Sequence, residues 1–149
     1  MKEAIANAGV FNLIIIFVII LLAFFLGSLS YSKAFKVKNK IVEEIEKDQG
    51  FEDETNTNID TWLGEIGYRV ISDNTWQCPH DEGGTPVTTS RNYQYCVYKF
   101  DTCEKDSDNG RCGEYYRVIA YMYFDVPIIS DLVRIPVKGE TITFTTLNM

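Results

Sequence analysis

The stretch from Phe11 to Leu29, FNLIIIFVIILLAFFLGSL, constrains what this chain can fold into more than any other part of the sequence. It is almost wholly apolar and contains no charged residue. At a rise of about 1.5 Å per residue, a helix of about 20 such residues spans a hydrocarbon core of about 30 Å. Only a helix lets one segment satisfy its own backbone hydrogen bonds in lipid. The sequence therefore predicts a single transmembrane helix over residues 10–31.

Two alternatives to a membrane span stay open. A buried helix of a globular core usually keeps a polar face, which this stretch lacks. A cleaved signal peptide has a basic start, a shorter apolar segment and small residues at its cleavage site. Lys2 is the only basic residue ahead of the run, and Ser28 and Ser30 match that cleavage pattern poorly. We therefore favour the membrane span.

Charge is distributed unevenly along the chain. Four lysines stand between positions 33 and 40, directly after the apolar run, with no acidic residue among them. From position 41 onward, nine basic and twenty acidic residues give a net charge of −11. An acidic domain repels phosphate backbones, so we expect no nucleic-acid partner.

The chain has four cysteines, Cys78, Cys96, Cys103 and Cys112, all far from the apolar run. An even number of cysteines in a small domain is typical of disulfides formed in an oxidising compartment. The absence of a C-x-x-C pair disfavours a zinc site. Four cysteines allow three pairings, and we favour Cys78–Cys96 with Cys103–Cys112.

The cysteines and the lysines disagree about which side of the membrane the domain occupies. Basic residues flanking a span usually lie in the cytoplasm, which would place the domain there. Disulfides require the opposite side. Because a short N-terminal tail carries little orienting charge, we follow the cysteines. We expect a single-pass protein of the cell membrane, with residues 1–9 as a leader or short cytoplasmic tail and residues 32–149 as an extracytoplasmic domain.

The rest of the chain predicts an α+β fold, in which the long N-terminal helix continues into an amphipathic helix packed on a small antiparallel β-sheet. Residues 33–47 contain no Gly or Pro, and apolar residues recur at helical spacing. These residues are Ala34, Val37, Ile41 and Ile45. Gly50 is expected to end this helix. Asn58 is expected to cap a short second helix, Ile59 to Ile66.

Four or five antiparallel strands should follow. They are expected at Tyr68 to Ser72, at Asn92 to Thr102 and at Tyr115 to Val126. A hairpin of Leu132 to Val137 and Thr141 to Thr146 should turn at Lys138-Gly139. In the hairpin, Ile142 and Phe144 are expected to point inward and the threonines outward. Both faces of the Tyr115 strand are apolar. We expect Tyr116, Val118, Ala120, Met122 and Phe124 to face the core. The opposite face, with Ile119 and Tyr121, should be covered by the N-terminal helix or by another subunit.

Catalytic and metal-binding motifs are not recognisable. The sequence has no Gly-rich phosphate loop after a strand and no G-x-S-x-G nucleophile motif, and His80 is its only histidine. The acidic stretch Glu104 to Gly113 fails the EF-hand template, which needs Asp or Asn where Lys105 and Ser107 stand. We expect no enzyme activity, no cofactor and no catalytic or metal-binding residue, although a calcium site of another type stays open there.

Several motifs resemble those of type IV pilin-like proteins. Gly9 precedes the apolar run, and YSKAFKVKN at residues 31–39 continues it without a break. Near the end, FDVP at residues 124–127 and VKGET at residues 137–141 add to the likeness. More specifically, the chain resembles the TadE-like minor pilins, or pseudopilins, of tight-adherence (Tad) systems of the Gram-positive type.

The resemblance implies a structural subunit of a pilus-like or secretion apparatus, with leader cleavage between Gly9 and Val10. Its implied partners are membrane lipid and pilin or pseudopilin subunits, in a homo-oligomer or surface filament. Pilins carry a glutamate five residues into the mature chain, and this chain has Ile14 there. The alternative function is a single-pass, membrane-anchored extracellular binding or sensor module.

Overall fold

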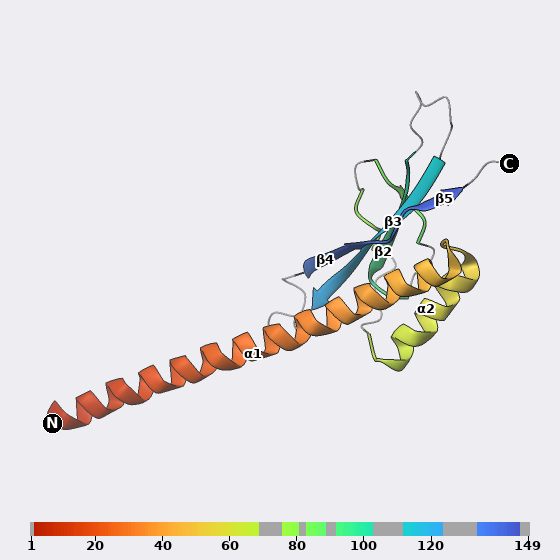
Figure 1. Ribbon diagram of the computed structural model, residues 1–149. Helices are drawn as coiled ribbons and strands as arrows, with labels where there is room; N and C mark the ends of the chain where they lie inside the picture. Colours follow the sequence, from red (N-terminus) through yellow and green to blue (C-terminus); the bar gives the residue numbers. More distant parts are fainter. Residues whose placement is uncertain are drawn as a thin grey trace.

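A computed structural model describes residues 2–68, 76–80, 83–88, 92–102, 112–123 and 134–146, with residues 2–8 as backbone only. One long helix projects from a small α+β head, and its N-terminal half stands clear of the rest of the chain (Figure 1). We call residues 10–29 the stalk and the described residues from 31 to 146 the head. The predicted fold class is confirmed.

The long helix, α1 (Lys2–Asp48), runs without interruption from the stalk into the head. This confirms the prediction that no linker separates the two. The helix ends one residue earlier than expected, because Gln49, with φ 55°, adopts the left-handed conformation in place of Gly50. The amide of Gly50 donates to the carbonyl oxygen of Ile45 at 3.1 Å, which closes the last turn.

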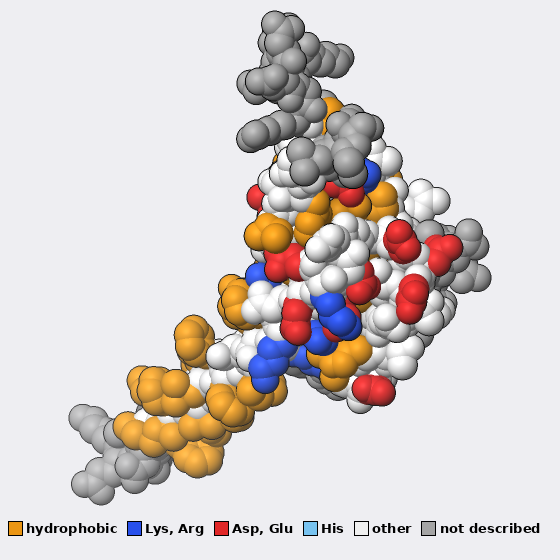
Figure 2. Space-filling model, turned by 45° about the vertical axis from the view of Figure 1, so that its right-hand side comes forward, with side chains coloured by type: hydrophobic (Ala, Val, Ile, Leu, Met, Phe, Trp, Pro, Cys, Tyr) orange, Lys and Arg blue, Asp and Glu red, His pale blue; other side chains and the backbone are white. Residues whose placement is uncertain are grey.

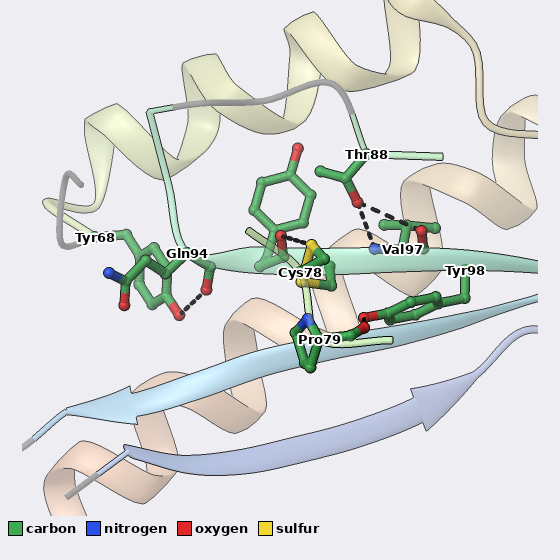
Figure 3. The surroundings of a disulfide bond; sticks show 9 residues. Tyr68, Cys78, Pro79, Thr88, Gln94, Val97 and Tyr98 are labelled. Atoms are coloured by element: carbon green, nitrogen blue, oxygen red, sulfur yellow. Dashed lines mark hydrogen bonds between the residues drawn. A yellow bond between two sulfur atoms is a disulfide. The ribbon is translucent and has the colours of Figure 1, made fainter. Parts of the chain in front are cut away.

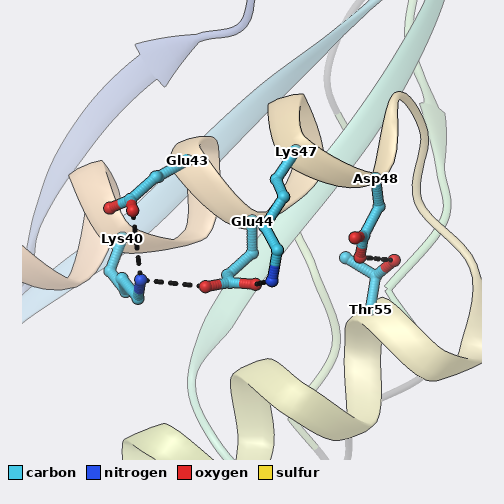
Figure 4. A network of polar contacts seen from close by, with 6 residues as sticks. All are labelled: Lys40, Glu43, Glu44, Lys47, Asp48 and Thr55. Atoms are coloured by element: carbon cyan, nitrogen blue, oxygen red, sulfur yellow. Dashed lines mark hydrogen bonds and ion pairs between the residues drawn. The ribbon is translucent and has the colours of Figure 1, made fainter.

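The second helix, α2 (Asp53–Glu65), begins earlier than predicted, so the expected cap at Asn58 is wrong. Asp53 and Glu54 occupy its first turn, where carboxylates interact favourably with the helix dipole. The Thr55 hydroxyl donates to the carboxylate of Asp48 at 2.7 Å. This bond ties the start of α2 to the end of α1 and fixes the corner between them (Figure 4).

The sheet is antiparallel and centred on β3. Its strands are β1 (Thr85–Pro86), β2 (Tyr95–Asp101), β3 (Cys112–Tyr123), β4 (Arg134–Glu140) and β5 (Phe144–Thr146). The order is β1-β2-β3-β4, and β5 also pairs with β3. The predicted strands around β2 and β3 are confirmed within the described residues, and residues 69–72 and 124–126 of the predicted strands lie outside them.

The predicted hairpin at Lys138-Gly139 is wrong, because both residues lie inside β4 and pair with β3. Strands β4 and β5 do not pair with each other; they follow one another along β3. Thr141, expected to point outward, is buried between them, and its hydroxyl accepts the amide of Tyr116 at 3.0 Å. Ile142, expected inside, is 64% exposed.

The core lies between the second half of α1, α2 and one face of the sheet. The expected stripe of Ala34, Val37, Ile41 and Ile45 is at most 1% exposed. The sheet contributes the side chains of β3 that were predicted to face inward together with two from β2, and α2 adds Ile59 and Leu63. The members from the strands are Tyr95, Val97, Tyr116, Val118, Ala120 and Met122. The amphipathic half of α1 therefore covers the sheet as predicted.

The opposite face of the sheet is not covered by the N-terminal helix, one of the two covers predicted; the other, another subunit, stays a prediction. Cys96, Tyr98 and Ile119 are buried there, and the residues packed on them include Trp76 and Cys78. The N-terminal helix lies on the other face, so its predicted role as this cover is wrong. The chain's own segment 76–80 supplies part of the cover instead.

Candidate functional site

The stalk exposes apolar side chains in every direction around its axis. Its large hydrophobic residues are between 41% exposed, at Ile15, and 81% exposed, at Phe24. None of its most apolar 18-residue window is buried inside the protein. A helix of a soluble core would be mostly buried, so that alternative does not fit this geometry. Within the described residues, α1 is the one helix long and apolar enough to cross a membrane.

Gly9 and Val10, the predicted cleavage position, lie inside α1 and are exposed. A Cβ atom added at Gly9 would meet nothing within 4 Å. Glycine in a helix interior costs about 1 kcal/mol relative to alanine. Packing within the described part of the protein therefore gives no reason for glycine at this position.

A disulfide joins Cys78 to Cys96, as favoured from the sequence. Cys96 is fully buried in β2, so the bond holds segment 76–80 against the outer face of the sheet (Figure 3). Trp76 packs edge-on against Tyr121, with 6.0 Å between ring centroids. The hydroxyl of Tyr98 donates to the carbonyl oxygen of Pro79. The disulfide thus holds segment 76–80 over apolar surface of the sheet that the rest of the described head leaves open.

The other two cysteines are only partly described. Cys112, at the start of β3, is disulfide-bonded, and no described cysteine is free. Cys103 and the acidic stretch Glu104 to Gly113, where the calcium alternative was left open, fall outside the described residues, except for the last two positions of that stretch. In the described part of the chain, no three His, Cys, Asp or Glu side chains gather as a metal site would require.

The side chain of Tyr68, just after α2, forms hydrogen bonds that connect parts of the head. Its hydroxyl donates to the carbonyl oxygen of Tyr121 at 2.9 Å and accepts the amide of the same residue at 3.2 Å. Burial raises the pKa of Tyr68 to about 12, because the charged phenolate would lose its hydration there. The tyrosine therefore joins the end of α2 to β3 in its neutral form.

Ion pairs occupy the exposed side of α1 within the head (Figure 4). Lys40 lies 2.8 Å from Glu44 and 3.3 Å from Glu43, and Lys47 lies 3.4 Å from Glu44. The hydrogen bond from Lys40 lowers the pKa of Glu44, and the same bond raises the pKa of Lys40. Exposed pairs of this kind contribute little to stability. Their main effect is to neutralise this part of the helix.

The only histidine, His80, lies at a cleft of about 340 Å³ on the outer face of the sheet. Tyr98, Ile119 and Tyr121 line its apolar part, and Lys138 lies at its edge. Among the described residues, those that line the cleft include no carboxylate and no cysteine. The described lining therefore offers mainly apolar surface, with one imidazole and one ammonium group.

The sequence predicted the stalk and the disulfide but not two contacts that join the second half of α1 to the rest of the head. Lys33 donates to the carbonyl oxygen of Gly67 at 2.9 Å, just beyond the end of α2. Lys38 lies across β4, where a Cβ at Gly139 would come within 2.2 Å of its Cδ. In the sequence, the glycine at position 139 was the available signal for the contact with Lys38. A Lys-Gly pair is also typical of turns, however, and it was interpreted as one. No protein-family model, curated protein or solved structure matches this chain, so the functional argument rests on its own geometry.

Proposed function

We propose that this protein is a non-enzymatic, membrane-anchored structural subunit, a minor pilin or pseudopilin of a type IV pilus-like or tight-adherence apparatus. The observation that carries the proposal is the continuity of α1 (Lys2–Asp48), whose first half is exposed and apolar and whose second half is built into the head.

The rigid joint between stalk and head supports an assembly role. Ala34 is 1% exposed and packs with Met122 and Val137 of the sheet, only five residues after the stalk ends. A tethered binding domain needs only a flexible linker to reach its partner. A joint without a linker fixes the direction of the stalk relative to the head, which matters when many copies must pack in register.

The all-round apolar surface of the stalk also suits such packing. Side chains in lipid can exchange lipid contacts for contacts with other helices at small free-energy cost, because both environments are apolar. The stalks would pack in the centre of the assembly, and the heads would lie outside. The disulfides support a head on the extracytoplasmic side, where thiols are oxidised.

A second candidate is a single-pass, membrane-anchored binding or sensor module. Ile14 favours it, because pilins use a glutamate at this position to pair with the N-terminus of a neighbouring subunit. Open space around Gly9 favours the first candidate, because nothing in the described part of the chain packs against that glycine and it is where the leader would be cut.

The experiment that separates the candidates follows the native protein in sheared filaments and in membranes. We expect immunogold labelling of surface filaments, recovery in the sheared fraction and a mass spectrum that lacks residues 1–9. The variant Ile19→Trp keeps the stalk apolar but enlarges it, so it should reach the membrane normally and fail to enter filaments. An intact Met1, with all protein in the membrane fraction, would contradict the assembly role and support the anchored module.

A further inference from the structure

The base of the head, where the stalk enters it, carries a cluster of cations. We call Lys33, Lys36 and Lys38 the lysine collar. Figure 2 shows basic side chains gathered at the junction of the apolar stalk and the head, with acidic side chains spread over the head beyond them. The chain from position 41 onward has a net charge of −11, so the collar stands out against an acidic head.

The charges of the collar are not neutralised in the way that those of its neighbours are. Lys40 and Lys47 both pair with Glu44. Among the described residues, neither Lys36 nor Lys38 has a carboxylate within ion-pair distance. The change from unpaired to paired lysines therefore occurs within one turn of α1, close to the stalk.

The structure also directs Lys38 toward the stalk. Its Nζ lies 4.4 Å from the ring centroid of Phe35, one turn nearer the N-terminus. Gly139 has no Cβ, and a Cβ at this position would come within 2.2 Å of the Lys38 Cδ. The stem of Lys38 can therefore lie flat on β4. Helical side chains lean toward the N-terminus, which here is the side of the stalk. The ammonium group is thus held near the membrane end of the head.

Aromatic and apolar side chains accompany the collar at the same level. Tyr31 and Phe35 stack with 6.3 Å between ring centroids and are 52% and 43% exposed. Ile135, at the start of β4, is 41% exposed. Exposed aromatic residues next to lysines at the end of an apolar helix are typical of the zone between hydrocarbon and water.

The spacing along the helix places Lys33 within a headgroup layer and the other two lysines of the collar just beyond it. At 1.5 Å per residue, Lys33, Lys36 and Lys38 lie about 6, 10 and 14 Å beyond Leu29. Headgroup and interfacial layers extend several ångströms beyond the hydrocarbon core on each side. Lysine side chains that extend back along the helix bring their ammonium groups into that layer.

We propose that the lysine collar binds the phosphates of anionic phospholipids, so that the base of the head docks on an anionic membrane surface. This inference rests on the membrane anchorage in the proposed function and does not depend on filament assembly. The acidic remainder of the head is repelled by the same surface. The base is therefore the face that the membrane holds, and the head stands upright on it.

The test uses the full-length protein reconstituted in phosphatidylcholine vesicles with a trace of spin-labelled phosphatidylglycerol or phosphatidylcholine. The motionally restricted fraction of each label gives the ratio of their association constants with the protein. Each lysine near an anionic surface changes an association constant by about fivefold, so we expect phosphatidylglycerol to be favoured by at least that factor. High salt should reduce the preference, because it screens the charges.

The double variant Lys36→Gln, Lys38→Gln should lower the ratio several-fold, to the part that Lys33 contributes. The matched control Lys40→Gln, Lys47→Gln removes the same charge from paired positions on the same helix and should keep the preference. A ratio near one for the unmodified protein would overturn the inference; it is the result expected if the acidic head of a second copy occupies the collar. An equal loss in both variants would also overturn it.

The same vesicles separate this inference from the proposed function. Protein that washes off at alkaline pH would overturn both, because the stalk would not be inserted. Protein that resists washing but shows no lipid preference would overturn the collar alone.

Discussion

The two halves of α1 share one continuous helical backbone and differ in almost everything around it. In the stalk, the large hydrophobic residues are at least 41% exposed. In the head, Val37, Ile41 and Ile45 are 0% exposed. The first half is apolar on all sides, and the second is apolar on one side only. A helical repeat of apolar residues thus identifies the half of α1 that packs on the rest of the protein. The half without such a repeat exposes apolar side chains on all sides and suits an apolar environment outside the protein.

Isoleucine therefore has two separate roles in the two halves of α1. Ile41 stabilises the head, since burial of such a side chain contributes about 1.5–3 kcal/mol to folding. Ile16 contributes nothing to the packing of the head, because it projects into the surroundings. Substitutions in the two halves should therefore affect different measurements.

The largest expected effect is on the stability of the head. Ile41→Ala should lower its free energy of unfolding by about 2–5 kcal/mol, because it leaves a cavity between α1 and the sheet. The measurement is denaturant unfolding of the solubilised protein, followed by tryptophan fluorescence. Ile19→Ala, the control in the stalk, should leave the unfolding midpoint unchanged. Equal destabilisation by both variants would contradict the division of α1 into two environments.

The converse effect is on membrane insertion. Ile16→Asp should disfavour insertion by about 2.5–3.5 kcal/mol, the cost of an acidic residue at the centre of a span. The fraction of protein that resists alkaline extraction measures this, and it should fall sharply while the head still folds. The control Asn39→Asp adds the same charge to an exposed position of the second half and should insert normally. Normal yield of Ile16→Asp in the membrane would count against the stalk as a span.

Removal of the Cys78–Cys96 bond should destabilise the head by about 3 kcal/mol, as expected for a bond that closes a loop of this length. The double variant Cys78→Ala, Cys96→Ala should lose this amount in denaturant unfolding and expose Trp76 to aqueous quenchers. Membrane yield should not change, because the stalk makes no contact with this segment. An unchanged unfolding midpoint would show that segment 76–80 covers the sheet without the bond.

Alkaline pH should destabilise the head while sparing the stalk. The pKa of Tyr68 is raised from 10.0 to about 12, so between these values the unfolded chain holds fewer protons than the folded one. The stabilising contribution of the neutral tyrosine is complete below pH 10 and is lost as pH rises toward 12, by up to about 3 kcal/mol. Tyr68→Phe should remove this part of the pH dependence. An identical alkaline slope in both proteins would contradict the assignment.

The smallest expected effect is at the end of α1. Gln49 holds a left-handed conformation that glycine adopts more easily, so Gln49→Gly should stabilise the head by about 1 kcal/mol. Gln49→Ala should give no such gain. Thermal unfolding of the two variants side by side would show the difference, and a lower melting temperature for the glycine variant would be inconsistent with this helix end.

The comparison also explains which parts of the fold could be predicted from the sequence. Ala34, Val37 and Ile41 belong to a local repeat, so their burial follows from spacing alone. The alternation in β2 and β3 likewise separates Val97 and Val118 from the residues of the opposite face. Local patterns of this kind decide which face of an element is buried.

Features that depend on contacts between distant residues could not be predicted in the same way. Lys138-Gly139 reads as a turn, but the stem of Lys38, far away in the sequence, lies against that glycine within a strand. The cover over Ile119 comes from segment 76–80, which has no strand or helix pattern of its own. For the lysine collar, the sequence gives the charges, but only the structure separates Lys38 from the paired Lys40.

The most direct test of the central claim is a spin-label scan along α1 of the full-length protein in lipid vesicles. Single labels at residues 10–29 should all be accessible to oxygen and shielded from a polar nickel reagent, with the greatest depth near residue 19 and no repeat of three to four residues. Labels at residues 36–47 should instead alternate between buried and water-exposed positions. A three-to-four-residue repeat of nickel accessibility within residues 10–29 would mean that this half lies on a surface, and it would contradict the account.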